Sequence, residues 1–216
     1  RFLESYLCGR SFENVPGKTS IPRRDGVKLR CGRTPRMTSI AWIVWAGMET
    51  VSDRVDLDPE LESRTLASDL LHEICQHALD VAPEECCGLL LAMPGQQAER
   101  AVRVTNVMTK MHAADPAAFP RDARHAYYMS EVEYLRSIQD AEARGEQVVA
   151  VYHSHFGQGC YLSADDLAFA SHPLFPFPDA DQIVVSLLRG KVQEVGVFEP
   201  RADAAGRFIG RRLEAI

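Results

Sequence analysis

The sequence predicts a mixed α/β fold, in which helices flank a curved, mixed β-sheet that forms a single domain behind an N-terminal extension. Three observations lead to this prediction: helix signals in three segments, short apolar or alternating runs between them, and a two-residue turn near the end of the chain. The composition is ordinary for a globular protein, with 46% hydrophobic and 25% charged residues among 216. Because no apolar run reaches the roughly 18 to 20 residues that span a bilayer, we do not expect a membrane protein.

The net charge of −6 is divided unevenly along the chain. Residues 1–36 hold nine Lys and Arg against three Asp and Glu, whereas the remainder holds fifteen against twenty-seven. We assign residues 1–60 to an extension and linker, and residues 61–216 to the folded domain. Few aromatic residues separate the basic ones, so we expect a solvated tail that binds no nucleic acid. A second interpretation, based on Met37 and Met48 near the change of composition, places the first 36 to 47 residues upstream of the functional protein.

The first helix is predicted by apolar residues at three- and four-residue steps. Leu66 and Leu70 begin this period, and Pro83 ends it. A short apolar run over residues 86–93 is typical of a buried strand. Residues 101–107 alternate between apolar and polar side chains, which predicts a second strand.

A long polar segment, residues 108–129, comes next and is expected to be a loop with one short strand at residues 126–129. Loops of this length within a domain often carry function. Ser130, with Glu133 three residues later, has the spacing of a capping box and predicts the start of the second helix. Gly145 is expected to end that helix.

The second half of the domain alternates strands with one further helix. Residues 147–153 are rich in β-branched side chains and predict a strand, and residues 163–171 predict a third helix opened by a polar cap. Residues 182–188 and 191–198 are joined by two residues and predict a hairpin. Residues 207–213 are expected to form a last strand.

The six cysteines lack both a CxxC pair and the density of a secreted disulfide scaffold, so we expect reduced thiols. No secretory signal is recognisable at the start of the sequence. Together these features predict a cytoplasmic protein.

A candidate metal site lies at the end of the strand predicted over residues 147–153. On a strand, His153 and His155 point to the same face with Cβ atoms roughly 6 to 7 Å apart, so both can reach one ion. Asp166 lies in the first turn of the helix that Ser163 caps. Two imidazoles and one carboxylate are the protein ligands of a hydrolytic zinc site. The alternative, surface histidines followed by an ordinary helix cap, is less consistent with a strand, a loop and a capped helix in this order.

Glu85 is the candidate general acid and base. It follows Pro83 at the junction between the first predicted helix and the apolar run of residues 86–93. We therefore expect Glu85 to lie at the edge of the sheet, on a backbone that is fixed in place. Taken alone, it is an ordinary turn residue. The interpretation of Glu85 as a catalytic residue therefore depends on a family resemblance.

The sequence Pro-x-Glu-x-Cys-Gly-Leu-Leu at residue 83, together with His-x-His-x7-Ser-x2-Asp at residue 153, resembles the JAMM (MPN+) family. These are zinc metalloproteases that remove ubiquitin or ubiquitin-like proteins. The resemblance spans residues 61–198 and implies the JAMM/MPN fold. One departure is that Phe156 and Gly157 stand where the family commonly has proline after the second histidine. The roles it implies are zinc binding by His153, His155 and Asp166, general acid–base catalysis by Glu85, and oxyanion stabilisation by Ser163.

The resemblance further implies a zinc-dependent peptidase or isopeptidase that cleaves after the C-terminal glycine of a ubiquitin-like or sulfur-carrier-like protein. Expected partners are that protein's tail, its conjugates, and activating or conjugating enzymes of the same operon. The segment 108–129 is where a strand would pair with the extended tail. Two alternatives remain: a non-catalytic MPN-type scaffold, and a zinc amidohydrolase acting on small amides. The presence of all the residues that the family uses for zinc binding and catalysis favours the enzyme. The short segment after the helix predicted over residues 163–171 favours a compact prokaryotic type.

Two other patterns are interpreted as structural. His72 and His77 flank a glutamate as in the zincin motif, but five residues separate them by about 140° around a helix, so they cannot share one ion. We expect both at the helix surface. Cys160 lies between the metal ligands, but nothing in the sequence supplies the third group that a cysteine nucleophile needs.

Overall fold

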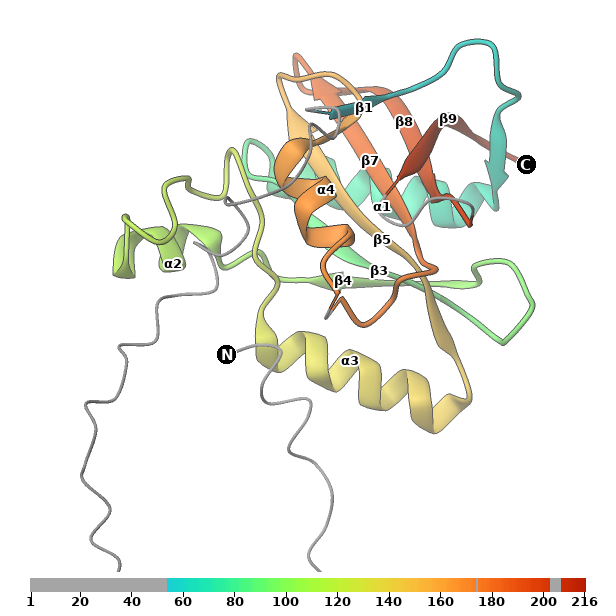
Figure 1. The fold of residues 1–216 in the computed structure, drawn as a ribbon, viewed down its shortest axis with the longest axis horizontal. Coiled ribbons are helices and arrows are strands. Elements are labelled where there is room, and N and C mark those ends of the chain that lie inside the picture. The colour runs from blue at the N-terminus through green and yellow to red at the C-terminus, as the bar shows by residue number, and fades with distance from the viewer. Residues whose placement is uncertain (1–53, 174, 203–206) are drawn as a thin grey trace, which may run out of the picture. The chain divides into compact units, whose positions relative to one another are not determined.

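The structure is a computed structural model that describes residues 54–173, 175–202 and 207–216. Most of the predicted extension lies outside these residues, so its assignment stays a prediction. Within the described residues the chain forms one seven-stranded sheet, one two-stranded sheet and four helices (Figure 1). The predicted mixed α/β fold with a helix-flanked mixed sheet is confirmed.

In chain order, the elements are β1 (Arg54–Asp56), β2 (Arg64–Leu66), α1 (Ser68–Val81), β3 (Cys87–Ala92), β4 (Arg100–Val104), α2 (Met108–Ala114), α3 (Glu131–Arg144), β5 (Gln147–Phe156), β6 (Tyr161–Ser163), α4 (Ala164–Ala170), β7 (Asp181–Leu188), β8 (Lys191–Pro200) and β9 (Phe208–Ala215). The large sheet has the order β2-β9-β8-β7-β5-β3-β4, and β1 pairs with β6 in the small one. Within the large sheet, β5 pairs parallel with β7 and β2 pairs parallel with β9, whereas its other pairs are antiparallel.

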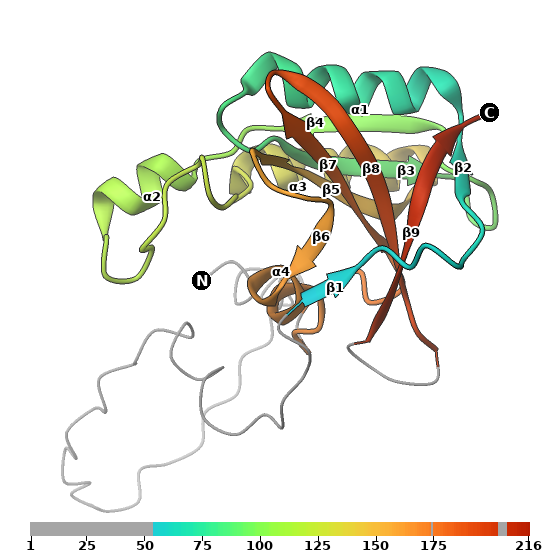
Figure 2. The same cartoon turned by 90° about the horizontal axis from the view of Figure 1, so that it is seen from above.

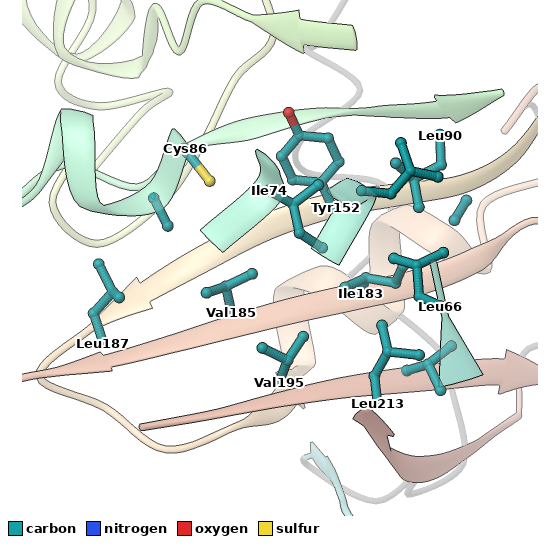
Figure 3. Close-up of a cluster of buried hydrophobic side chains, with 14 residues drawn as sticks. Leu66, Ile74, Cys86, Leu90, Tyr152, Ile183, Val185, Leu187, Val195 and Leu213 are labelled. Carbon is teal, nitrogen blue, oxygen red and sulfur yellow. The ribbon is translucent and has the colours of Figure 1, made fainter. Parts of the chain in front are cut away.

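Helix α1 lies along one face of the large sheet, and α4 lies with β1 and β6 on the opposite side (Figure 2). The apolar period that predicts α1 places Leu70, Ile74 and Ala78 in the core between helix and sheet. Fully burying an aliphatic side chain of this kind contributes about 1.5 to 3 kcal/mol. Figure 3 shows this cluster and labels Leu66, Ile74, Cys86, Leu90, Tyr152, Ile183, Val185, Leu187, Val195 and Leu213.

The prediction of a loop over residues 108–129 is wrong in its first part, because Met108–Ala114 forms α2. None of the residues of α2 is buried, so the helix has no apolar face for a periodicity to reveal. The short strand expected at residues 126–129 is also absent, since only Met129 makes an isolated antiparallel bridge, to Asn106. This single bridge holds Met129 beside Asn106 but does not extend into a β-strand.

Helix α3 begins after Ser130 and ends at Gly145, whose φ of 73° is the left-handed conformation that glycine adopts readily. Its predicted capping box is wrong, because Ser130 makes no side-chain cap. The carboxylate of Glu133 instead accepts hydrogen bonds from the backbone N and Oγ1 of Thr105, at 2.7 and 3.0 Å. The two donor groups of Thr105 therefore replace Ser130 as the hydrogen-bonding partner of Glu133.

The remaining predicted strands and the hairpin are present. Arg189 and Gly190 have φ values of 53° and 73°, as a type I′ hairpin turn requires. Strand β5 runs three residues beyond the predicted end, to Phe156. Residues 54–57, which fall within the predicted linker, pair with β6 and with Gly210. None of the helices in the described part of the chain has the length and apolar composition that a membrane span requires.

Gly88 on β3 lies where two elements approach closely. A Cβ atom at this position would overlap both the carbonyl oxygen of Val102 and the ring of Tyr152. We therefore expect Gly88→Ala to lower the free energy of unfolding by about 1 to 3 kcal/mol, as overpacked cores do. Urea denaturation measures this change. Gly159→Ala is the control, because its Cβ meets nothing closer than 3.6 Å, and an equal loss in both variants would contradict the prediction.

Candidate metal centre

His153 and His155 lie on β5, which is paired on both edges. At His153 the register places Cys87 of β3 on one side and Val184 of β7 on the other. His153 is completely buried, and His155 is 4% exposed. Because neighbouring strands fix this backbone, the two imidazoles converge, with their Nε2 atoms 3.2 Å apart.

Asp166 reaches the same point from α4. Ser163 caps this helix: its Oγ accepts from the backbone N of Asp166 at 3.3 Å, while the Asp166 Oδ2 accepts from the Ser163 backbone N at 2.9 Å. This reciprocal capping box directs the carboxylate back toward β5. Its Oδ2 lies 3.6 Å from Nε2 of His153 and 3.8 Å from Nε2 of His155. The structure thus brings together the three residues that the sequence pattern combines.

The spacing of these three atoms fits a tetrahedral zinc ion. Zinc binds imidazole nitrogen and carboxylate oxygen at about 2.0 to 2.2 Å, so two ligands of one ion lie about 3.3 to 3.6 Å apart. The observed separations of 3.2, 3.6 and 3.8 Å lie within about 0.2 Å of this range. Among the described residues, His153, His155 and Asp166 are the one group of histidine, cysteine or acidic side chains that could hold a metal ion.

Hydrogen bonds orient the side chains of His155 and Asp166, whereas the buried Nδ1 of His153 has no hydrogen-bond partner among the described residues. Nδ1 of His155 lies 3.0 Å from the carbonyl oxygen of Gly159, which can only accept, so this nitrogen carries the hydrogen. In the neutral ring the lone pair then lies on Nε2, the atom that faces the site. The hydroxyl of Ser163 donates to Oδ2 of Asp166 at 2.6 Å.

The charges of the cluster support one another. Burial opposes the ionisation of Asp166, but the two histidines and the hydrogen bond from Ser163 outweigh it and hold its pKa well below the usual value. Burial also lowers the pKa of His155, but Asp166 and the charge of Glu85 raise it above its usual value overall. The site therefore keeps Asp166 as a carboxylate beside the two imidazoles, a set of donor groups that suits a divalent cation.

Glu85 lies at the same site and is 5% exposed. Its backbone N donates to the carbonyl oxygen of Ala123 at 2.7 Å. Burial raises the pKa of its carboxyl, and the charges of His153 and His155 act against this rise. A carboxyl whose pKa is raised toward neutrality is suited to accept and return a proton.

Tyr127 is a site residue that the sequence pattern does not reveal. Its ring stacks on His153, with centroids 4.8 Å apart and an angle of 26° between the planes. On the other side of the pair, the ring of Tyr161 lies 5.0 Å from that of His155. Tyr127 comes from the polar segment before α3, where no period or motif distinguishes one aromatic residue from another. Only the tertiary fold places its ring against His153.

The expectation that both His72 and His77 lie at the helix surface is wrong for His77. His72 is exposed, but His77 is buried, and its Nδ1 lies 2.9 Å from the hydroxyl of Tyr152. His77 follows Ile74 by three residues, so the apolar period of α1 directs it into the core. The two histidines do not share a site.

Burial lowers the pKa of His77 from 6.5 to about 4. The unfolded chain therefore takes up the proton first, so the stability that the neutral ring contributes is complete above pH 6.5 and is lost as the pH falls toward 4. We expect His77→Gln, in metal-free protein, to reduce the fall in unfolding free energy between these pH values. Urea denaturation across the range tests this, with His72→Gln as control. A wild-type pH dependence in His77→Gln would contradict it.

Cys160 is buried, and its Sγ donates to the carbonyl oxygen of Val184 at 3.3 Å. Burial raises the pKa of this thiol to about 12, so it is not a thiolate at neutral pH. The four cysteines of the described residues are all free: Cys75, Cys86, Cys87 and Cys160.

Comparison with known proteins gives matches of three kinds. The model of Prok-JAB, the prokaryotic homologs of the JAB domain, matches residues 67–200. Among curated proteins, the chain is similar to the CysO-cysteine peptidases of Mycobacterium bovis and Mycobacterium tuberculosis. Each is 28% identical over 122 residues, which are 56% of this chain and 71% of the relative.

Among solved structures, the chain is similar to a protein from Desulfitobacterium hafniense, with 20% identity, a TM-score of 0.49, and coverage of 70% of this chain and 92% of that one. A protein from Salinibacter ruber gives 25% identity, a TM-score of 0.46, and coverage of 71% and 90%. A JAB1/MPN domain protein from Archaeoglobus fulgidus gives 14% identity, a TM-score of 0.40, and coverage of 71% and 100%.

Proposed function

Because the chain belongs to the Prok-JAB family, the prokaryotic homologs of the JAB domain, we propose that it is a zinc-dependent peptidase. Its substrate is a small sulfur-carrier or ubiquitin-like protein, and the bond cleaved follows the C-terminal glycine. The observation that carries the proposal is the set of three donor atoms at zinc spacing, from two buried histidines and the partly buried Asp166, beside the buried Glu85. The name of the mycobacterial relatives, CysO-cysteine peptidase, supports removal of an amino acid from a carrier protein.

His153, His155 and Asp166 would hold the zinc ion, which would supply a Lewis acid for the scissile carbonyl and for the attacking water. Glu85 takes a proton from the attacking water and returns it to the leaving amine, for which its raised pKa suits it. The buried histidine pair keeps the ligand geometry fixed while the proton moves.

Ser163 is proposed to donate a hydrogen bond to the oxyanion that forms during attack. In this structure its hydroxyl hydrogen is directed at Oδ2 of Asp166, at 2.6 Å. A serine hydroxyl has one hydrogen, so donation to the oxyanion requires this hydrogen to turn away from Asp166 by rotation about the Cβ–Oγ bond. The backbone N of Ser163 continues to donate to Asp166 during this rotation, so the ligand stays oriented.

A cytoplasmic location and a partnership with activating or conjugating enzymes of the same operon complete the proposal. The free thiols of the described cysteines are consistent with a reducing compartment. An encoded neighbour that activates a carrier-protein C-terminus would provide the substrate of this enzyme.

The test is a cleavage assay on metal-replete protein. The substrates are sulfur-carrier and ubiquitin-like proteins that carry either one additional C-terminal amino acid or a lysine in isopeptide linkage, and intact mass reports the loss of the extension. We expect cleavage after the terminal glycine of at least one substrate, and none with chelator. A protein that cleaves only small amides is an amidohydrolase, and one that cleaves nothing while binding carrier proteins is a scaffold. Either result overturns the proposal.

A further inference from the structure

The side chain of Asn106 uses its whole hydrogen-bonding capacity beside the metal centre. Its Nδ2 donates to the carbonyl oxygens of Glu85 and Ala126, at 2.9 and 3.1 Å. Its Oδ1 accepts from the backbone N of Met108 at 2.9 Å and of Tyr128 at 3.0 Å. A side-chain amide has two donor hydrogens and two acceptor lone pairs, and here each has a partner.

These four contacts join two parts of the site that approach the metal ligands separately. One part is the backbone of Glu85, the proposed general acid and base. The other is the backbone on both sides of Tyr127, whose ring stacks on His153. One side chain thus connects the proton-transfer group to the residue that covers a metal ligand.

We infer that Asn106 is a positioning residue for the proposed reaction, which sets the place of Glu85 relative to Tyr127 and the metal ligands. This inference rests on the proposed peptidase function. Asn106 itself acts through Glu85 and needs no contact with the substrate.

The chemistry of the contacts explains why an asparagine occupies this position. The carbonyl oxygens of Glu85 and Ala126 are both acceptors, so they cannot bond to each other and require a donor of two hydrogens between them. Aspartate has the same shape but no such hydrogens, and it would place a negative oxygen against both carbonyls. Asn106→Asp therefore removes these two contacts while it keeps the acceptor for Met108 and Tyr128.

Other hydrogen bonds keep the segment folded without the Asn106 side chain. The backbone N of Val107 donates to Tyr128 at 2.8 Å, and that of Ser130 donates to Thr105 at 2.9 Å. The backbone N of Glu85 still donates to Ala123. Loss of the amide should therefore loosen Glu85 locally without unfolding the domain.

The experiment compares wild type with Asn106→Asp and Asn106→Ala. Thr105→Val is the matched control, because it removes a side-chain hydrogen bond of the adjacent residue that leads to Glu133 instead of the site. Three quantities are measured: kcat and KM separately on the cleaved carrier protein, zinc per chain, and hydrogen exchange of the peptides over residues 84–88 and 122–129.

For both Asn106 variants we expect kcat to fall about 10- to 100-fold, as displacement of a catalytic group does, with KM within about threefold of wild type. Zinc content stays at the wild-type value. Exchange of the two site peptides increases about tenfold, as local opening allows, while exchange of β7 and β8 does not change. Thr105→Val shows none of these effects.

The inference is overturned if kcat of Asn106→Asp stays within about twofold of wild type, or if the loss is in KM alone. Unchanged exchange at residues 84–88 also overturns it, even when the variants are inactive. Should Asn106→Asp fail to fold, Asn106→Ala, which introduces no charge, decides by the same measurements; global unfolding of both variants contradicts a positioning role. If wild type cleaves no substrate, the proposed function fails, but hydrogen exchange still decides whether Asn106 holds Glu85.

Discussion

Glu85→Gln is expected to lower kcat by about 10²- to 10⁴-fold, the range that general acid–base catalysis contributes. Glutamine has the shape of glutamate, so the buried position 85 should be filled as before. An amide, however, neither takes a proton from water nor returns one to the leaving amine. Zinc content and the thermal midpoint should therefore stay close to wild type, and steady-state kinetics on the cleaved carrier protein measures the loss.

Glu84→Gln is the matched control for this substitution. Glu84 precedes Glu85, and its Oε1 accepts from the hydroxyl of Thr109 at 3.3 Å, a contact that a glutamine oxygen can retain. We expect wild-type kinetics from this variant. Equal activity of Glu85→Gln and wild type would exclude Glu85 as the base, and equal loss in both variants would point to a general effect of charge.

Asp166→Asn is expected to abolish zinc binding at micromolar metal, with less than a tenth of the wild-type zinc per chain. The Oδ2 of Asp166 lies within 3.8 Å of both imidazole Nε2 atoms, so this oxygen would complete the proposed set of three zinc ligands. A metal present at 1,000 times its Kd stabilises the folded state by about 4 kcal/mol. The variant should lose the rise in thermal midpoint that zinc gives the wild type.

Asp165→Asn provides the control, because this neighbouring carboxylate is exposed and pairs with Arg121 instead of the cluster. We expect it to bind one zinc per chain. Metal analysis after gel filtration and thermal unfolding with and without zinc measure both effects. Stoichiometric zinc in Asp166→Asn would place the metal site elsewhere.

The fold and the metal cluster follow largely from short-range rules of sequence. Alternation on a strand places His153 and His155 on one face, and a Ser-x-x-Asp cap places Asp166 at the start of a helix. The match to Prok-JAB confirms the family resemblance that these motifs predict. The strand alternation and the helix cap need only neighbours within a few residues, whereas the family resemblance rests on two short motifs that begin at residues 83 and 153.

The features that the sequence does not predict depend on partners distant in the chain. Glu133 has the spacing of a capping box, but its carboxylate bonds to Thr105, 28 residues away. Tyr127 covers His153 from a segment without apolar period, and Asn106, near the end of the strand predicted over residues 101–107, bonds to Glu85. Since the period of a helix or strand reports only which face is buried, it does not identify a polar or aromatic side chain that completes a distant site.

The capping box of α4 has a kinetic consequence for a zinc ion bound at the proposed site. The hydrogen bonds between Ser163 and Asp166 both start the helix and aim the ligand, and α4 has seven residues, too few for a helix to persist without its packing. Opening of this one helix therefore withdraws a ligand while the sheet that carries the histidines stays folded. Zinc should then leave at a rate set by the fraying of α4, and its dwell time should follow the hydrogen exchange of the helix amides instead of the global stability.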